Sequence, residues 1–134
     1  MEKRVWLNGR LCAEAEAVVL GADGTVAEAA MSNLFVVRDG VVTTPLLASG
    51  CLPGIMRAVV LETCGLEGIE CREMEVTVGD LRSAAEVFLT SAVRRVQWVA
   101  TVDGEQLPPA GDEGVTARLA RAVEARAAAE SVML

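Results

Sequence analysis

The 134-residue chain contains no histidine and no tyrosine, and Lys3 is its only lysine. Without histidine, a Ser-His-Asp triad, a Cys-His pair and a histidine-ligated metal site are all excluded. Basic residues are also scarce, with 12 Lys and Arg against 19 Asp and Glu and a net charge of -7. Nucleic-acid binding needs a basic surface that displaces counterions. We therefore expect no metal and no nucleic-acid partner.

Long apolar runs are missing as well. No stretch approaches the roughly 18 apolar residues of a membrane span, and the charged start of the chain is not typical of a signal peptide. The four cysteines, Cys12, Cys51, Cys64 and Cys71, form no C-x-x-C pair. We interpret them as small apolar residues of a reducing compartment. The sequence thus predicts a cytoplasmic protein without a membrane partner.

Turn residues between short β-type runs dominate the first third of the chain. They predict three hairpins, with turns at Asn8-Gly9, Gly21 to Gly24 and Asp39-Gly40. A helix is predicted to begin near Pro53 and to stop at Gly65. The elements predicted after it are strands at 69–76, 86–90 and 96–102, a short helix at 80–85 and a closing helix at 113–129. This pattern indicates one mixed α/β domain with β-hairpins and two main helices.

The closing helix shows an apolar stripe at helical spacing. Val115, Leu119, Ala122 and Val123 form the stripe, and Arg126 falls on it by position. Two interpretations of Arg126 are open. Either its aliphatic stem lies along apolar surface with the charge in water, or the stripe ends there.

The residues from Glu28 to Arg57 carry a distinctive set of types at fixed spacing. The set consists of Glu28, Asn33-Leu34-Phe35, a hairpin, Thr44 and Leu52-Pro53-Gly54-Ile55-Met56-Arg57. It resembles the signature of the class IV aminotransferase family, the fold-type IV pyridoxal-phosphate (PLP) enzymes. That family includes branched-chain and D-amino acid aminotransferases and aminodeoxychorismate lyase. The resemblance implies the fold of the family's PLP-binding domain and pyridoxal 5'-phosphate as the cofactor.

The resemblance continues beyond this motif. Gly68-Ile69-Glu70 and Ala85 to Ala92 are similar to the family's second phosphate turn and the strand leading to it. It implies that residues 17–134 form the carboxy-terminal, PLP-binding portion. Residues 1–16 resemble only the first strand of a family member. The residues that the resemblance assigns to the cofactor are Glu28, Asn33, Ile55, Met56, Arg57, Thr90, Ser91 and Ala92.

Elementary chemistry agrees with the central assignments. PLP acts as an electron sink while its ring nitrogen is protonated, which an adjacent carboxylate such as Glu28 favours. A helix beginning at Pro53-Gly54 offers the N–H groups of Ile55 and Met56 to a phosphate. Taken alone, Glu28 could be a solvated surface charge and Pro53-Gly54 an ordinary helix start. Within the family pattern we expect PLP or another phosphate anion as the partner.

Two positions favour one branch of the family. Met56 and Ala92 stand where the aminotransferases more often have threonine, and their surroundings look more like aminodeoxychorismate lyase. This resemblance favours lyase chemistry over transamination.

The Schiff-base lysine of the family has no evident counterpart. It lies one strand and one long helix before the glutamate that matches Glu28, whereas only 27 residues precede Glu28 here. Lys3 could substitute, or it could be an exposed lysine near a terminus. The chain is therefore either a shortened PLP-dependent enzyme, a non-catalytic remnant or phosphate-binding module, or an inactive partial product. Loss of a domain would bare apolar surface, so we expect a homo-oligomer.

Overall fold

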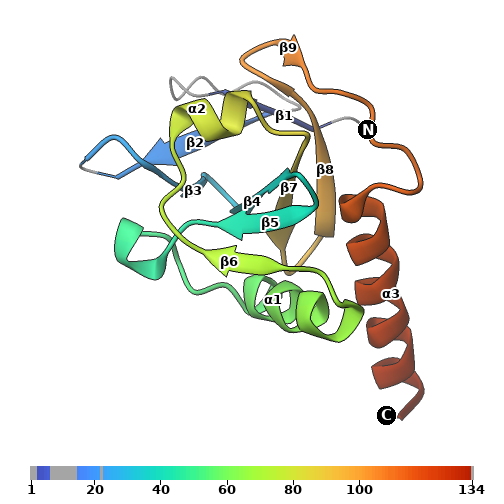
Figure 1. Ribbon diagram of the computed structural model, residues 1–134. Helices are drawn as coiled ribbons and strands as arrows, with labels where there is room; N and C mark the ends of the chain where they lie inside the picture. The colour runs from blue at the N-terminus through green and yellow to red at the C-terminus, as the bar shows by residue number, and fades with distance from the viewer. Residues whose placement is uncertain (1–2, 7–14, 22, 134) are drawn as a thin grey trace.

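The computed structural model describes residues 3–6, 15–21 and 23–133 (Figure 1). These residues form one sheet in the strand order β3-β2-β1-β8-β7-β4-β5-β6, with β9 paired to β8. The strands are β1 (Lys3–Trp6), β2 (Ala15–Leu20), β3 (Val26–Ala29), β4 (Asn33–Arg38), β5 (Val41–Thr44), β6 (Cys71–Glu73), β7 (Glu86–Ser91), β8 (Arg95–Val102) and β9 (Glu105–Gln106). The helices are η1 (Leu47–Ser49), a 3-10 turn, and α1 (Ile55–Glu67), α2 (Val78–Arg82) and α3 (Val115–Met133). Within this part of the chain, no helix is long and apolar enough to cross a membrane.

Side-chain alternation in the central strands divides the core between the two faces of the sheet. Phe35 of β4 and Phe88 of β7 stack with ring centroids 4.8 Å apart, and they pack with residues of α1 and α3. Their neighbours Leu34 and Leu89 point to the opposite face and pack with Leu81 of α2. Because Glu86 and Thr90 share the parity of Phe88, they belong to the face that α1 and α3 cover. The mixed α/β fold expected from the sequence is confirmed.

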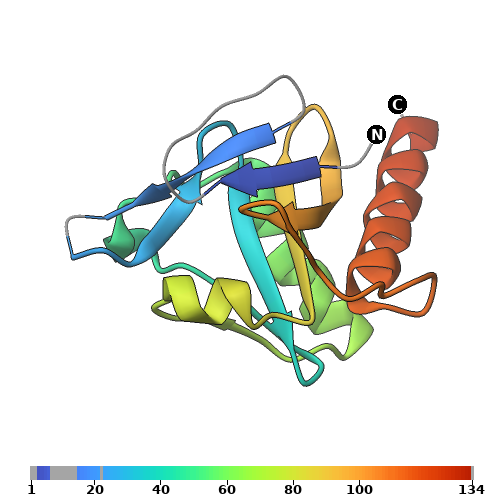
Figure 2. The same ribbon diagram turned by 90° about the horizontal axis from the view of Figure 1, so that it is seen from above.

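Two of the three predicted hairpins are confirmed. The strands β2 and β3 pair antiparallel, as do β4 and β5. Asp39 and Gly40 have φ values of 52° and 76°, as the type I′ turn requires. The turn predicted at Asn8-Gly9 lies outside the described residues, and β1 pairs with β2 in parallel. Figure 2 shows the β2–β3 hairpin and α3 at opposite sides of the molecule.

The end of α1 differs from the prediction. The helix continues through Gly65 to Glu67, and its C-cap is Gly68, whose φ of 69° lies in the left-handed region. The N–H of Ile69 then donates to Cys64 O at 2.9 Å, which turns the chain back toward the sheet. Gly65 and Gly68 are both compatible with a helix end. The helix ends at the later glycine because the chain turns back toward the sheet there.

The segment after α1 is also less regular than predicted. The strand expected over 69–76 is confined to Cys71–Glu73, because the chain then crosses toward β3, where Val76 bridges Val26. The short helix begins at a capping box formed by Thr77 and Asp80 rather than at Asp80 itself.

The position of Arg126 on α3 resolves the two interpretations of the apolar stripe. Its guanidinium donates to Thr63 Oγ1 at 3.1 Å and to Glu62 Oε1 at 3.2 Å. Leu119 and Val123 are buried, whereas Arg126 is partly exposed. The apolar stripe therefore ends before Arg126, which joins α3 to α1 by polar contacts.

Candidate functional site

A cavity of about 290 Å³ lies where the first turn of α1 meets the ends of β3 and β7. The pairing of β4 with β7 creates this meeting point, because it sets Asn33 directly opposite Thr90. Seven of the eight residues assigned from the sequence line the cavity, and Arg57 does not. The seven are Glu28, Asn33, Ile55, Met56, Thr90, Ser91 and Ala92.

Glu28, on β3, is the only charged residue among those that line the cavity. Its Oε1 accepts a hydrogen bond from the N–H of Leu52 at 2.7 Å. The carboxylate is half-buried and tied to the loop before α1, unlike a freely solvated surface charge. This bond leaves further acceptor capacity on the carboxylate.

The N-terminus of α1 supplies hydrogen-bond donors to the same cavity. Gly54 is its N-cap residue, without a side-chain capping bond, and the first turn contains no acidic residue. The first N–H groups of a helix have no intrahelical acceptor and carry partial positive charge. The N–H groups of Ile55 and Met56 are therefore suited to an anion.

The backbone at Gly54 has no room for a larger residue. The Nδ2 of Asn33 donates to Leu52 O at 2.9 Å, which fixes the amide beside the helix start. A Cβ at position 54 would collide with Asn33 Oδ1. Two hydrogen bonds to the backbone of Leu52 thus hold the loop before α1. Glu28 accepts from the N–H of Leu52, and Asn33 donates to the carbonyl oxygen of Leu52.

Polar groups from the end of β7 close the other side of the cavity. Thr90 is 2% exposed, and its Oγ1 has no hydrogen-bond partner within the described part of the chain. The Oγ of Ser91 accepts a hydrogen bond from the N–H of Arg94 at 3.1 Å. Ala92 is exposed and has no hydroxyl to offer.

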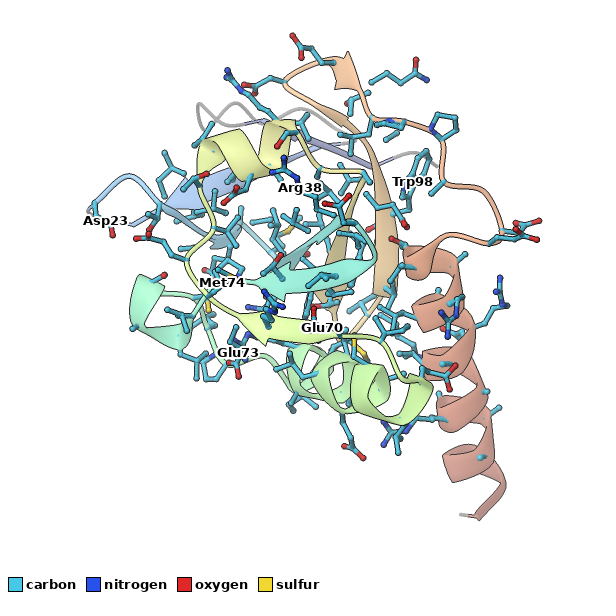
Figure 3. The ribbon with its side chains drawn as sticks, in the orientation of Figure 1. Asp23, Arg38, Glu70, Glu73, Met74 and Trp98 are labelled. Atoms are coloured by element: carbon cyan, nitrogen blue, oxygen red, sulfur yellow. The ribbon has the colours of Figure 1, made fainter. Side chains whose placement is uncertain are left out.

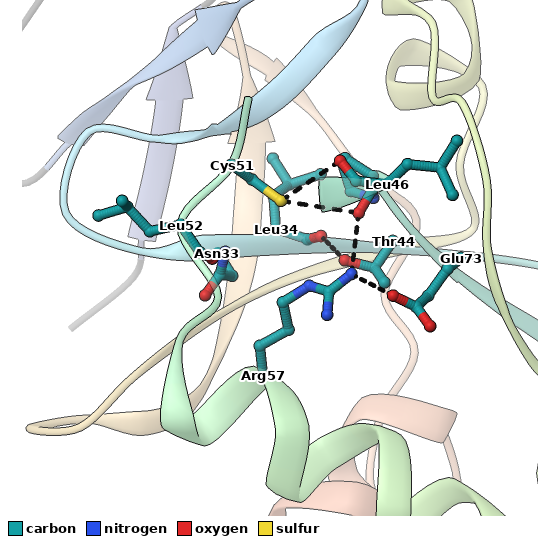
Figure 4. Close-up of polar contacts among 9 residues, drawn as sticks. Asn33, Leu34, Thr44, Leu46, Cys51, Leu52, Arg57 and Glu73 are labelled. Atoms are coloured by element: carbon teal, nitrogen blue, oxygen red, sulfur yellow. Dashed lines mark hydrogen bonds and ion pairs between the residues drawn. The ribbon is translucent and has the colours of Figure 1, made fainter. Parts of the chain in front are cut away.

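Arg57 takes a different position from the one that the sequence suggested. Its guanidinium is buried and donates to Pro45 O at 3.1 Å and to Glu73 Oε1 at 2.7 Å (Figure 4). Arg57 therefore joins α1 to the loop after β5 and to β6. Its ion-pair partner is 16 positions away in the sequence, so the motif gave no sign of this contact.

Sequence reasoning missed the contribution of Leu52. Its backbone binds both Glu28 and Asn33, and its side chain lines the cavity while remaining 70% exposed. Met31 and Ile55, which also line the cavity, are 73% and 82% exposed. The position of Leu52 immediately before Pro53-Gly54 is the one feature of the sequence that could have indicated its place in the site.

Cys51 lies next to this loop as a protonated thiol. Its Sγ contacts Leu46 O at 3.5 Å and Pro45 O at 3.8 Å. Burial raises the pKa of Cys51, and the nearby charge of Arg57 only partly offsets that effect. The thiol is a structural neighbour of the cavity and not a nucleophile at neutral pH.

The sequence model of the family described as "Amino-transferase class IV" matches residues 8–102. The chain belongs to this family. The curated branched-chain-amino-acid aminotransferase of Escherichia coli (strain K12) is 36% identical over 107 residues, which cover 80% of this chain and 35% of that protein. The chain thus spans about a third of the length of the curated relatives that head the comparison.

Solved structures of class IV aminotransferases and of a related lyase share the fold. The E. coli branched-chain enzyme matches with a TM-score of 0.76 and 36% identity, over 82% of this chain and 36% of that chain. An aminotransferase from Brucella abortus, bound to the cofactor PLP, matches with 0.75 and 32%, over 81% and 38%. The 4-amino-4-deoxychorismate lyase of Pseudomonas aeruginosa matches with 0.74 and 30%, over 85% and 42%.

The structure places the only lysine of the sequence at the start of a strand. Lys3 is the first residue of β1, in register with Val99 of β8. Only β2 separates β1 from β3, which carries Glu28. The side chain of Lys3 lies outside what the structure describes.

Proposed function

We propose that the Glu28 cavity holds pyridoxal 5'-phosphate and serves PLP-dependent C–N bond chemistry on an amino acid or an amino-chorismate. The observation that carries the proposal is the meeting of a carboxylate and an uncapped helix N-terminus in one cavity of about 290 Å³. Three features fit the cofactor. Thr90 has a buried hydroxyl without a partner among the described residues, Gly54 caps α1 without a side-chain bond to its first N–H groups, and the first turn of α1 has no competing carboxylate.

Each group has a distinct role in this proposal. When bound, PLP supplies an electron sink for the reacting amino carbon. Glu28 holds a proton at the ring nitrogen, because a carboxylate there favours the protonated form. The N–H groups of Ile55 and Met56 bind the phosphate, and the turn at Ser91-Ala92 adds a second set of donors. The apolar residue Leu52 lines the cavity beside these groups.

We propose that this chain supplies the phosphate and ring-nitrogen side of the site, without the family's Schiff-base lysine. The matches to both branched-chain aminotransferases and aminodeoxychorismate lyases support the reaction class. Met56 and Ala92 favour the lyase branch. The exposed apolar side chains of Met31, Leu52 and Ile55 favour association with a second surface, which we propose is another copy of the chain.

A non-catalytic phosphate- or PLP-binding module is the second candidate function. The presence of only one lysine in the sequence favours it. Transaminase or lyase turnover distinguishes the enzyme from the binding module. Both candidate functions require anion binding at the N-terminus of α1.

The purified chain, titrated with PLP by calorimetry, tests the proposal. We expect weak, saturable binding that inorganic phosphate competes away. Glu28→Gln should weaken binding by less than about 3-fold, because the carboxylate acts on the ring and not on the phosphate. Absence of any phosphate-sensitive binding would contradict the cofactor assignment.

Borohydride reduction tests the role of Lys3. We expect no stoichiometric PLP adduct on this lysine. A stable adduct at Lys3, lost in Lys3→Ala together with transaminase or lyase turnover, would overturn the view that this chain lacks the reactive lysine. Phosphate competition measured on Lys3→Ala shows whether the anion site survives the substitution.

A further inference from the structure

A second cavity, of about 400 Å³, lies between β8, the first turns of α3 and the segment that connects β9 to α3. It shares no lining residue with the Glu28 cavity. Glu86 begins β7 and lines this second cavity, whereas Thr90 and Ser91 end the same strand at the first one. The two cavities therefore occupy opposite ends of β7.

Two buried polar side chains line the second cavity. Glu86 is 6% exposed, and its oxygens accept the N–H groups of Val115 at 3.0 Å and Thr116 at 2.8 Å. Thr116 is 5% exposed, and its Oγ1 has no hydrogen-bond partner among the described residues. A buried hydroxyl without a partner carries a cost that a bound hydrogen-bonding group would remove. Each carboxylate oxygen of Glu86 also has a second lone pair that can accept a further hydrogen bond.

The remaining walls are apolar and leave an aromatic ring beside the empty space. Trp98 of β8 is 36% exposed and lines the cavity, near the segment that leads into α3 (Figure 3). Ala117 and Ala120 of α3 are short side chains in the lining, so they leave the space unfilled. A flat apolar molecule could therefore lie against the indole, since aromatic rings attract one another in offset or edge-to-face arrangements.

We propose that this cavity binds a small neutral aromatic molecule of one or two rings that carries one hydroxyl or amino group. The ring packs against Trp98, and the polar group bonds to Thr116 and Glu86. The buried carboxylate of Glu86 repels anionic ligands. The size of the cavity lies in the range typical of small-molecule sites.

Three matched probes test the ligand class on the whole chain. We expect 2-naphthol to bind saturably, with a shift of the Trp98 indole N–H signal in NMR and a heat in calorimetry. Naphthalene, without the hydroxyl, should bind about 10-fold more weakly, and the anion 2-naphthoate should bind more weakly still. The signal is assigned by its loss in Trp98→Phe. No saturable binding of 2-naphthol, or equal binding of 2-naphthoate, would overturn the proposal.

Thr116→Val replaces the hydroxyl by a methyl group of similar size, so it tests the contribution of the hydroxyl alone. It should lower 2-naphthol affinity about 10-fold and leave naphthalene affinity unchanged. Thr101→Val is the matched control, because Thr101 also has a buried Oγ1 without a partner in the described region but does not line the cavity. If both variants bind 2-naphthol as the parent does, Thr116 is not part of a binding site and the proposal fails.

Filling the cavity gives an independent test. Ala120→Leu should abolish binding of both neutral probes, whereas Ala125→Leu, on an exposed position of the same helix, should not. Circular dichroism checks that each variant is folded. Undiminished 2-naphthol binding by folded Ala120→Leu would place the ligand elsewhere. If Ala120→Leu does not fold, the contrast between Thr116→Val and Thr101→Val decides.

Discussion

The N-termini of α1 and α3 are built in opposite ways. The buried carboxylate of Glu86 accepts the N–H groups of Val115 and Thr116, so the protein itself satisfies two of the first donors of α3. At α1 the cap is Gly54, with no side-chain bond and no acid in the first turn. The short helix α2 resembles α3 in this respect, since it begins at a capping box. The difference separates a helix start that stabilises the fold from one that is open to a ligand.

The surroundings of the two helix starts reinforce the contrast. Leu119 and Val123 of α3 are buried against the sheet. Around the start of α1, by contrast, Leu52 and Ile55 are largely exposed. The start of α1 thus combines exposed apolar side chains with backbone N–H groups that have no intrahelical acceptor. This combination is expected of a binding site.

The largest effect on stability should come from removing the acid that caps α3. Glu86→Ala deletes two charge-assisted hydrogen bonds in a buried place, and we expect a loss of about 3 kcal/mol in the free energy of unfolding. Glu28→Ala, at the other carboxylate, should cost less than about 1 kcal/mol. Urea denaturation of both variants measures the contrast. Equal losses would show that Glu28 is a structural residue in the same sense as Glu86.

Gly54→Ala should have the next largest effect. The added Cβ collides with Asn33 Oδ1, so we expect a loss of about 1–2 kcal/mol and more than about 10-fold weaker PLP binding. Gly65→Ala is the matched control within the same helix, where a Cβ meets open space. It should raise stability by up to about 1 kcal/mol with PLP affinity unchanged. Unaltered PLP binding in Gly54→Ala would contradict the assigned phosphate site.

A smaller effect is expected at the ion pair behind α1. Glu73→Gln weakens the pairing of Arg57, whose guanidinium keeps its bond to Pro45 O. Because Glu73 is 46% exposed and water screens the pair, we expect a loss of only about 1 kcal/mol. Thermal unfolding measures this change, and PLP affinity should change little since Arg57 does not line the cavity. A collapse of PLP binding would show that Arg57 positions the start of α1.

The smallest change in stability comes from making α1 resemble α3. Met56→Glu introduces an acid into the first turn, which should stabilise the helix by about 0.5 kcal/mol through its dipole. The same carboxylate should abolish phosphate-sensitive PLP binding. Met56→Gln, a neutral control of similar size, should retain that binding. Tight PLP binding by Met56→Glu would be incompatible with a phosphate at the N–H groups of this turn.

Local signals in the sequence predicted the features that depend on neighbouring residues. Asp39-Gly40 predicted its hairpin, and Pro53-Gly54 predicted the start of α1, because turn and cap preferences act over a few positions. The family pattern also identified residues that share one cavity, because seven of the eight residues assigned from it line that cavity.

The features that the sequence did not predict depend on distant contacts. The choice of Gly68 over Gly65 as the end of α1 follows from the return of the chain to the sheet. Glu86 caps a helix that begins 29 positions later, and nothing in its own neighbourhood indicates this role. The parallel pairing of β1 with β2 likewise has no local signal in the sequence.

An NMR titration of the ¹⁵N-labelled chain with PLP tests the central contrast most directly. Saturable shifts should be largest at the amides of Ile55 and Met56 and at Ser91-Ala92, and inorganic phosphate should reproduce the shifts in α1. The amides of Val115 and Thr116, already bonded to Glu86, should remain unchanged. Shifts centred on α3, or no saturable shift at the start of α1, would contradict the assignment of the phosphate site.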